Sequence, residues 1–144
     1  MHVAVSKEGL PLGMEISAGN EHDSLYFTDV ADKIELKGVR GRPKRRPAEI
    51  NADPAYDTEF IRCYLRRRGI KANIPVNKRN RKQPKRGRLF RFDKESYENR
   101  GAVERFNSWI ESFKRILVRF ERLKVTFIAF VNLACTMILW RVLK

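Results

Sequence analysis

Two consecutive helix-forming segments in the C-terminal third constrain the fold of this chain most strongly. From residue 103 to 120 large apolar side chains recur at steps of three and four, which is the spacing of one helical face. They are Val103, Phe106, Trp109, Ile110, Phe113, Ile116, Leu117 and Phe120. This pattern predicts a long helix that begins near Ser96 to Asn99, with these side chains in the core. From about Lys124 to Leu143 the sequence is apolar nearly all round, which predicts the most buried helix of the fold.

The apolar run within that last segment is too short to indicate a membrane span. Val125 to Trp140 is interrupted by Thr126, Asn132 and Thr136, and a span needs about 20 apolar residues. We therefore expect a helix buried in a protein core, a cytoplasmic protein and no membrane partner.

The first half of the chain alternates strand and helix signals. Residues 2–6 and 10–17 predict a β-hairpin around Lys7-Glu8-Gly9. A helix is expected from Asp23 or Ser24 to about Lys33, and short strands are expected at 48–52 and 70–76. Between these strands Asp57 is expected to cap a helix over 58–68, which Gly69 ends. The order predicts an α/β fold with a hairpin, two further strands and long C-terminal helices.

The charge of the chain indicates a polyanionic partner. Among 144 residues, 31 Lys and Arg against 17 Asp and Glu give a formal charge of +14. The positive charge is concentrated between Asn77 and Arg91, a stretch without acidic residues, and its members are Lys78, Arg79, Arg81, Lys82, Lys85, Arg86, Arg88 and Arg91. Residues 77–95 contain too few apolar side chains to fold alone, so we expect a flexible basic loop, with nucleic acid as the favoured partner. The plainer alternatives are a solvated surface or a ribosome-associated protein.

Two carboxylates stand out against this basic background. Asp53 follows the short apolar stretch at 48–52, and Glu104 lies on the polar stripe of the predicted long helix together with Arg100 and Lys114. Carboxylates at a strand end and on a helix can share divalent metal ions. In the plainer interpretation Asp53 forms a turn before Pro54, and Glu104 pairs with Arg100 four residues earlier, which a metal-free protein should show.

Several short motifs, in a constant order, extend over essentially the whole chain. They are Gly19-Asn20-Glu21-His22-Asp23, Ala52-Asp53-Pro54-Ala55-Tyr56-Asp57, Ile74-Pro75, Tyr97-x2-Arg100-x3-Glu104-Arg105-Phe106 and Phe120-Glu121-Arg122. Each motif is weak alone, but their order and spacing resemble the DDE transposases of prokaryotic insertion sequences, with the IS-four/IS-five group most similar. The resemblance implies a ribonuclease H-like fold and a catalytic triad of two Asp and one Glu.

The resemblance also assigns roles to particular residues. Asp53 matches the second Asp and Glu104 the Glu, and both would bind the two Mg²⁺ or Mn²⁺ ions expected in the complete enzyme. Tyr97 and Arg100 match the signature around that Glu. By the same resemblance Arg100 and Lys114 would neutralise phosphate or orient the carboxylate, and the basic loop would hold the DNA backbone. The family usually has a Lys seven residues after the Glu, where this chain has Glu111. Lys114, one helical turn further, is the expected substitute.

The first Asp of the triad has no counterpart in these 144 residues. In the family it lies on a strand that precedes the hairpin, whereas Asp23 and Asp32 follow the hairpin. We therefore expect residues 1–144 to form part of a DDE transposase catalytic domain, an incomplete ribonuclease H-like fold whose first central strand is missing. Such a C-terminal fragment should be inactive alone. Its partners would be transposon ends and target DNA at the nucleoid, with self-association but no small-molecule substrate.

Two other functions compete with this interpretation. A non-catalytic remnant could coat DNA or inhibit a full-length transposase, and an upstream segment with an Asp-ended strand would argue against it. A basic RNA-binding or ribosome-binding protein would leave the spacing of Tyr97, Arg100 and Glu104 a coincidence, and therefore ranks lower.

Overall fold

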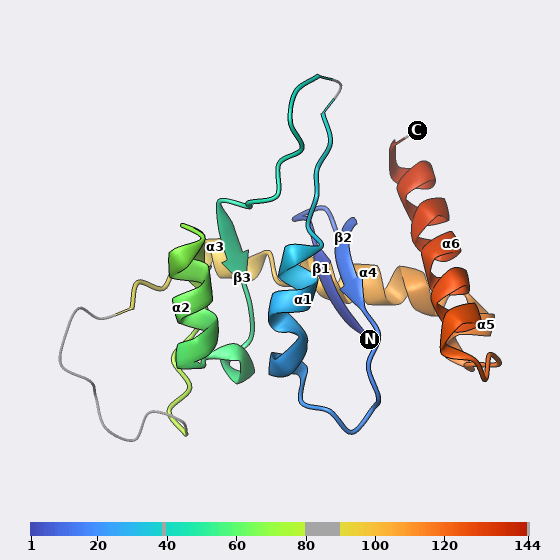
Figure 1. The fold of residues 1–144 in the computed structure, drawn as a ribbon, viewed down its shortest axis with the longest axis horizontal. Helices are drawn as coiled ribbons and strands as arrows, with labels where there is room; N and C mark the ends of the chain where they lie inside the picture. Colours follow the sequence, from blue (N-terminus) through green and yellow to red (C-terminus); the bar gives the residue numbers. More distant parts are fainter. Residues whose placement is uncertain (39, 80–89, 144) are drawn as a thin grey trace.

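The computed structural model describes residues 1–38, 40–79 and 90–143 as a mixed α/β fold. Two small sheets lie among the helices, and the described strands of one sheet do not pair with those of the other (Figure 1). The predicted α/β class is therefore confirmed.

The N-terminal sheet is the predicted hairpin. Strands β1 (His2–Val5) and β2 (Pro11–Glu15) pair antiparallel, with Val3 opposite Met14 and an irregularity in register between Ala4 and Val5. The short 3-10 helix η1 (Asp23–Tyr26) leads into α1 (Phe27–Asp32), which packs against the hairpin. The side chain of His22, not of Asp23 or Ser24, caps η1 by accepting a hydrogen bond from the Ser24 amide.

The second sheet joins strands β3 (Glu49–Asn51) and β4 (Lys71–Asn73), which run parallel. The connection between them contains η2 (Pro54–Tyr56) and α2 (Glu59–Arg67), so β3, α2 and β4 form a β-α-β unit. Gly69 ends α2 with a φ of 64°, as the sequence predicts. The expected cap at Asp57 is wrong, because Thr58 caps α2 by accepting a hydrogen bond from the Ile61 amide.

The predicted long helix is broken into three. Helix α3 (Lys94–Glu98) is followed by α4 (Gly101–Glu111) and by a single turn, α5 (Lys114–Leu117). Phe113 interrupts the helical path with an extended ψ of 90°. Phe106 and Ile110 are buried and Trp109, Phe113 and Ile116 pack beside them, as predicted. Beyond the break the pattern holds for Ile116 but fails for Leu117 and Phe120, which are 59% and 67% exposed.

Helix α6 (Lys124–Leu143) has the predicted bounds but not the predicted burial. It buries one side, formed by Val131, Ala134, Cys135 and Ile138, against the hairpin and α4. Its other side leaves Val125 and Trp140 78% and 72% exposed. Residues Lys124–Val142 are long and apolar enough to cross a membrane by length and composition alone. The expectation of the most buried helix is therefore wrong, since an even apolar composition hides which side meets the core.

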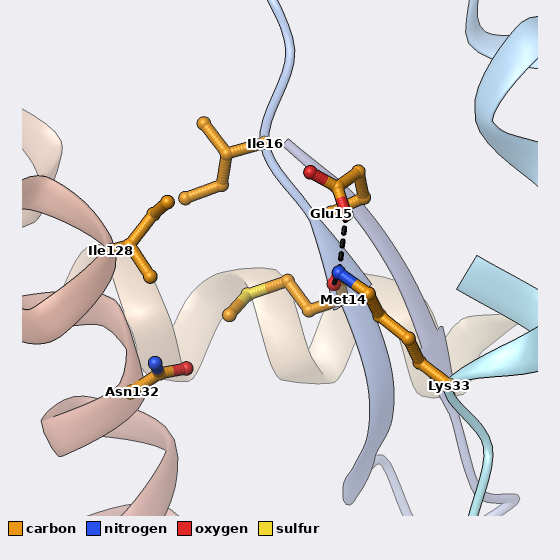
Figure 2. Close-up of a pocket in the computed structure, with 6 residues that line it drawn as sticks. All are labelled: Met14, Glu15, Ile16, Lys33, Ile128 and Asn132. Carbon is orange, nitrogen blue, oxygen red and sulfur yellow. Dashed lines mark hydrogen bonds and ion pairs between the residues drawn. The ribbon is translucent and has the colours of Figure 1, made fainter. Parts of the chain in front are cut away.

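A small hollow separates α6 from the hairpin. Met14 points from β2 toward Ile128 and Asn132 of α6 (Figure 2). The hollow has a volume of about 270 Å³. Among the described residues that line the hollow, the charged ones are Glu15 and Lys33, and they form an ion pair with each other. These two side chains therefore offer an ionic ligand no uncompensated charge.

The described residues form two hydrophobic cores rather than one. The first joins Ile16 of the hairpin to α4 and α6, and the second joins Ile61 and Leu65 of α2 to Ile70 and Ile74 around β4. Phe27 of α1 contacts the second core, where its ring lies 5.7 Å from that of Tyr56. Helix α1 therefore links the two halves.

The contact between α1 and the hairpin depends on a glycine in β2. A Cβ atom at Gly13 would lie 2.6 Å from the backbone oxygen of Val30, closer than real Cβ contacts. Gly13→Ala should therefore push α1 from the sheet and destabilise the chain by about 1–3 kcal/mol. Equilibrium urea unfolding measures the change. Gly19→Ala is the matched control, because nothing lies within 4 Å of its added Cβ; equal losses in both variants would contradict the proposed contact.

Candidate active site

Asp53 lies at the carboxyl end of β3, where ligands of parallel sheets commonly bind. The backbone of Asp53 is extended, and Pro54 starts the 3-10 turn that follows. In this turn the Tyr56 amide donates a hydrogen bond to the Asp53 carbonyl over 2.9 Å. The backbone of Asp53 therefore takes part in the turn that the plainer interpretation predicted. Its side chain remains 45% exposed and is available for other contacts.

The side chains of Tyr97 and Arg100 converge on Asp53. Arg100 Nη1 lies 3.1 Å from Asp53 Oδ1, and the Tyr97 hydroxyl donates weakly to the same oxygen over 3.4 Å. Arg100 Nη1 also donates to the Tyr97 hydroxyl over 3.2 Å. The Tyr97 hydrogen bond and the Asp53 charge raise the pKa of the Arg100 guanidinium, which therefore stays charged. Three residues from two distant motifs thus form one polar cluster.

Glu104 stands beside this cluster as a solvent-exposed residue of α4. The expected ion pair between Glu104 and Arg100 is not among the described ion pairs, because the guanidinium turns to Asp53 instead. The charge of Glu104 still contributes to the raised pKa of Arg100. Asp53 and Glu104 therefore flank the same guanidinium, one in direct contact and the other by a longer-range interaction.

A polar ladder that sequence reasoning missed fixes α3 on the second sheet. Asn51 and Asn73, neighbours in the parallel register, are hydrogen-bonded to each other over 2.7 Å. Asn51 donates to the Ser96 carbonyl, and Ser96 Oγ donates to Glu49 over 2.6 Å. Asparagine at corresponding positions of two short strands was the available signal. The ladder holds α3 against the sheet and so helps to determine where Tyr97 and Arg100 point.

A second missed feature is the buried ion pair of Asp57 and Arg62. Arg62 Nε lies 2.6 Å from Asp57 Oδ1, with side chains 3% and 0% exposed. Arg62 Nη2 also donates to the Ile74 carbonyl over 2.7 Å, and the Asn77 amide donates to Asp57 Oδ2 over 2.8 Å. Buried charges persist in a fold only when paired in this way. The pair thus connects the Asp53 turn to α2 and to the start of the basic stretch.

The helix break removes the reason for placing Lys114 near Glu104. The prediction required one continuous helix, but α4 ends at Glu111 and Lys114 begins α5 after the turn at Phe113. Both Glu111 and Lys114 are exposed. A role for Lys114 stays a prediction without this geometric support.

The basic stretch is described only at its two ends. Lys78, Arg79 and Arg91 are exposed. Arg81, Lys82, Lys85, Arg86 and Arg88 lie outside the described residues, so their predicted contact with DNA stays a prediction.

The carboxylates suit a hard divalent cation in their chemistry. Mg²⁺ prefers oxygen ligands and is often held by one or two carboxylates together with water and substrate phosphate. Asp53 and Glu104 supply such oxygens on exposed side chains. Within the described part of the chain no group of three or more His, Cys, Asp or Glu could hold a metal ion. The fit is thus that of an incomplete site that needs further oxygen ligands.

Comparisons with known proteins agree on one family. A family model described as "Transposase DDE domain" matches residues 1–139. The chain is 33% identical over 144 residues to a protein of Burkholderia cepacia named as the transposase for insertion sequence element IS402. It is 28% identical over 138 residues to a protein of Brucella ovis named as the transposase for insertion sequence element IS6501.

The two relatives differ in how much of their length this chain covers. The match spans 99% of this chain but 63% of the Burkholderia protein, whereas it spans 96% of this chain and 95% of the Brucella protein. No solved structure matches the chain.

Tyr56, between Asp53 and Asp57, gives a pH-dependent test of the local packing. Burial, with a smaller effect from the negative charges of Asp23 and Asp53, raises the pKa of the Tyr56 hydroxyl to about 12. An unfolded tyrosine titrates near pH 10, so the folded chain binds the proton more tightly. The stability from Tyr56 should be complete below pH 10 and be lost as the pH rises toward 12.

Tyr56→Phe should remove this part of the alkaline loss, which unfolding midpoints at pH 9 and 11 would measure. Tyr97→Phe is the control, since Tyr97 lies in the polar cluster at Asp53 and not in this core. An unchanged alkaline loss in Tyr56→Phe would show that Tyr56 titrates normally.

Proposed function

The chain belongs to the DDE transposase family, and we propose that it forms part of a catalytic domain that cuts and joins DNA during transposition. The observation that carries the proposal is the convergence of Tyr97 and Arg100 on Asp53, with Glu104 one turn along α4. Residues of two distant motifs thereby lie together at the carboxyl end of a parallel strand.

Asp53 and Glu104 are the residues that would hold divalent metal. The bound ions would supply Lewis-acid activation of water or of a DNA 3′-hydroxyl for attack on a phosphodiester. Arg100 balances the charge of Asp53, and Tyr97 limits the directions that both side chains can take. When DNA enters, the same guanidinium can donate to a phosphate oxygen, since its planar fork matches such oxygens.

We further propose that the two sheets belong to one incomplete ribonuclease H-like sheet. Helix α1 packs on the hairpin, α2 packs near β4, and α1 and α2 contact each other, so helices continue across both sheets. The described strands β1 and β3 nevertheless do not pair. A strand between them would join the sheets and satisfy backbone groups that otherwise remain an open edge. Such a strand would also carry the remaining carboxylate of the triad to Asp53.

On this proposal the 144-residue chain is a partial catalytic domain that is inactive alone. The chain spans 63% of the length of the Burkholderia relative, which leaves room in that protein for a further strand. DNA, both transposon ends and target, is the proposed partner, in the cytoplasm at the nucleoid. Self-association would bring two DNA ends together.

A nicking and strand-transfer assay with Mg²⁺ or Mn²⁺ tests the proposal. The chain would be compared alone and joined to the segment encoded upstream. We expect activity only in the joined form, and we expect Asp53→Asn or Glu104→Gln to lower it by about a hundredfold or more, because each removes negative charge that holds the metal.

Glu98→Gln is the matched control, since Glu98 is an exposed carboxylate at the end of α3. It should retain activity. Equal losses in Glu98→Gln and Glu104→Gln would remove the special role of Glu104. DNA binding without cleavage in every form would favour the rival function, a non-catalytic DNA-binding remnant.

A further inference from the structure

A second pocket lies on α2, between this helix and the segment that enters α3. It has a volume of about 310 Å³, and the described residues that line it include four basic side chains but no acidic ones. The basic residues are Arg62, Arg66, Lys71 and Arg91. Phe90, Ile70 and Ala72 supply its apolar wall. A pocket with positive charge and an apolar wall favours an anionic ligand that also carries a hydrocarbon part.

Two of the four cations already have acidic partners. Arg62 is paired with buried Asp57, and Lys71 Nζ lies 2.7 Å from Glu49 and 3.3 Å from Asp93. Hydrogen bonds to these two acids raise the pKa of Lys71, and the one to Glu49 has the larger effect. Neither Arg66 nor Arg91 takes part in an ion pair among the described residues. The uncompensated charge of the pocket therefore belongs to these two arginines.

The pocket is held in shape by its floor. Arg62 is fixed by Asp57 and by the Ile74 carbonyl, and its guanidinium lies 3.8 Å from the centre of the Phe90 ring. Arg66 follows Arg62 by four residues, so both emerge from the same face of α2. The buried pair thus holds Phe90, and with it the neighbouring Arg91, next to the face of α2 that carries Arg66.

We propose that this pocket binds one sugar–phosphate unit of DNA, with Arg66 and Arg91 on the phosphate and Phe90, Ile70 and Ala72 against the deoxyribose. The assignment rests on the proposed function for its choice of DNA. Arginine pairs are suited to phosphate because each guanidinium can donate two parallel hydrogen bonds. With Arg66 and Arg91 on the phosphate and apolar side chains on the sugar, no contact of this pocket reaches a base edge, so it grips the backbone without sequence preference.

The test is the salt dependence of DNA binding by the 144-residue chain, measured with a duplex of about 30 base pairs between about 50 and 200 mM salt. The double variant Arg66→Gln/Arg91→Gln should lower the slope of log affinity against log salt by about one, the value for one lost phosphate contact. The change should be equal for unrelated sequences. Arg66→Lys/Arg91→Lys keeps the charge and should restore the slope.

Arg42→Gln/Arg67→Gln is the matched control, because it removes the same charge from arginines outside the pocket. It should leave the slope close to that of the unaltered chain. Equal slope losses in both double variants would overturn the pocket and leave only diffuse electrostatic binding. A slope loss with RNA of the same length but not with DNA would assign the pocket to RNA. Failure of the unaltered chain to bind DNA would contradict the proposed function itself.

Discussion

The part of the structure around the second hydrophobic core depends most on the buried ion pair of Asp57 and Arg62. Both side chains are almost completely buried, and together they contact the Ile74 carbonyl, the Asn77 amide and the Phe90 ring. Loss of one partner would leave a charge buried without compensation, which typically costs about 3–5 kcal/mol. The pair therefore determines how the Asp53 turn, the end of β4 and both described ends of the basic stretch lie relative to α2.

The polar cluster at Asp53 depends on a second, more exposed set of contacts. Asn51 and Asn73 fix α3 against the sheet, and α3 in turn brings Tyr97 and Arg100 to Asp53. Asp53 and Arg100 are each nearly half exposed, so their ion pair contributes little stability. A weak pair is suited to a site where a metal ion or a phosphate must compete for the same groups. The buried pair thus supplies rigidity, and the exposed pair can exchange partners.

The sequence predicted the parts of this structure that local patterns determine. Alternation and turn residues predicted the hairpin, Gly69 marked the end of α2, and the spacing of Phe106 and Ile110 identified the buried face of α4. The resemblance to the DDE transposases implied that Asp53, Tyr97 and Arg100 belong to one site. It could not predict that Arg100 would choose Asp53 over Glu104, nor that Asp57 would leave the helix cap for Arg62, because both choices depend on tertiary distances.

The errors in the C-terminal third have one physical cause. The composition of a helix shows how apolar it is. It does not show how much surface the neighbouring elements offer for the helix to pack against. Helix α4 and the hairpin together offer α6 one contact face, so Val131 and Ile138 are buried while Val125 and Trp140 remain exposed. The same limited surface leaves Leu117 and Phe120 exposed after the break at Phe113. Two separate cores have this consequence, since they cannot bury the apolar area that one continuous core would cover.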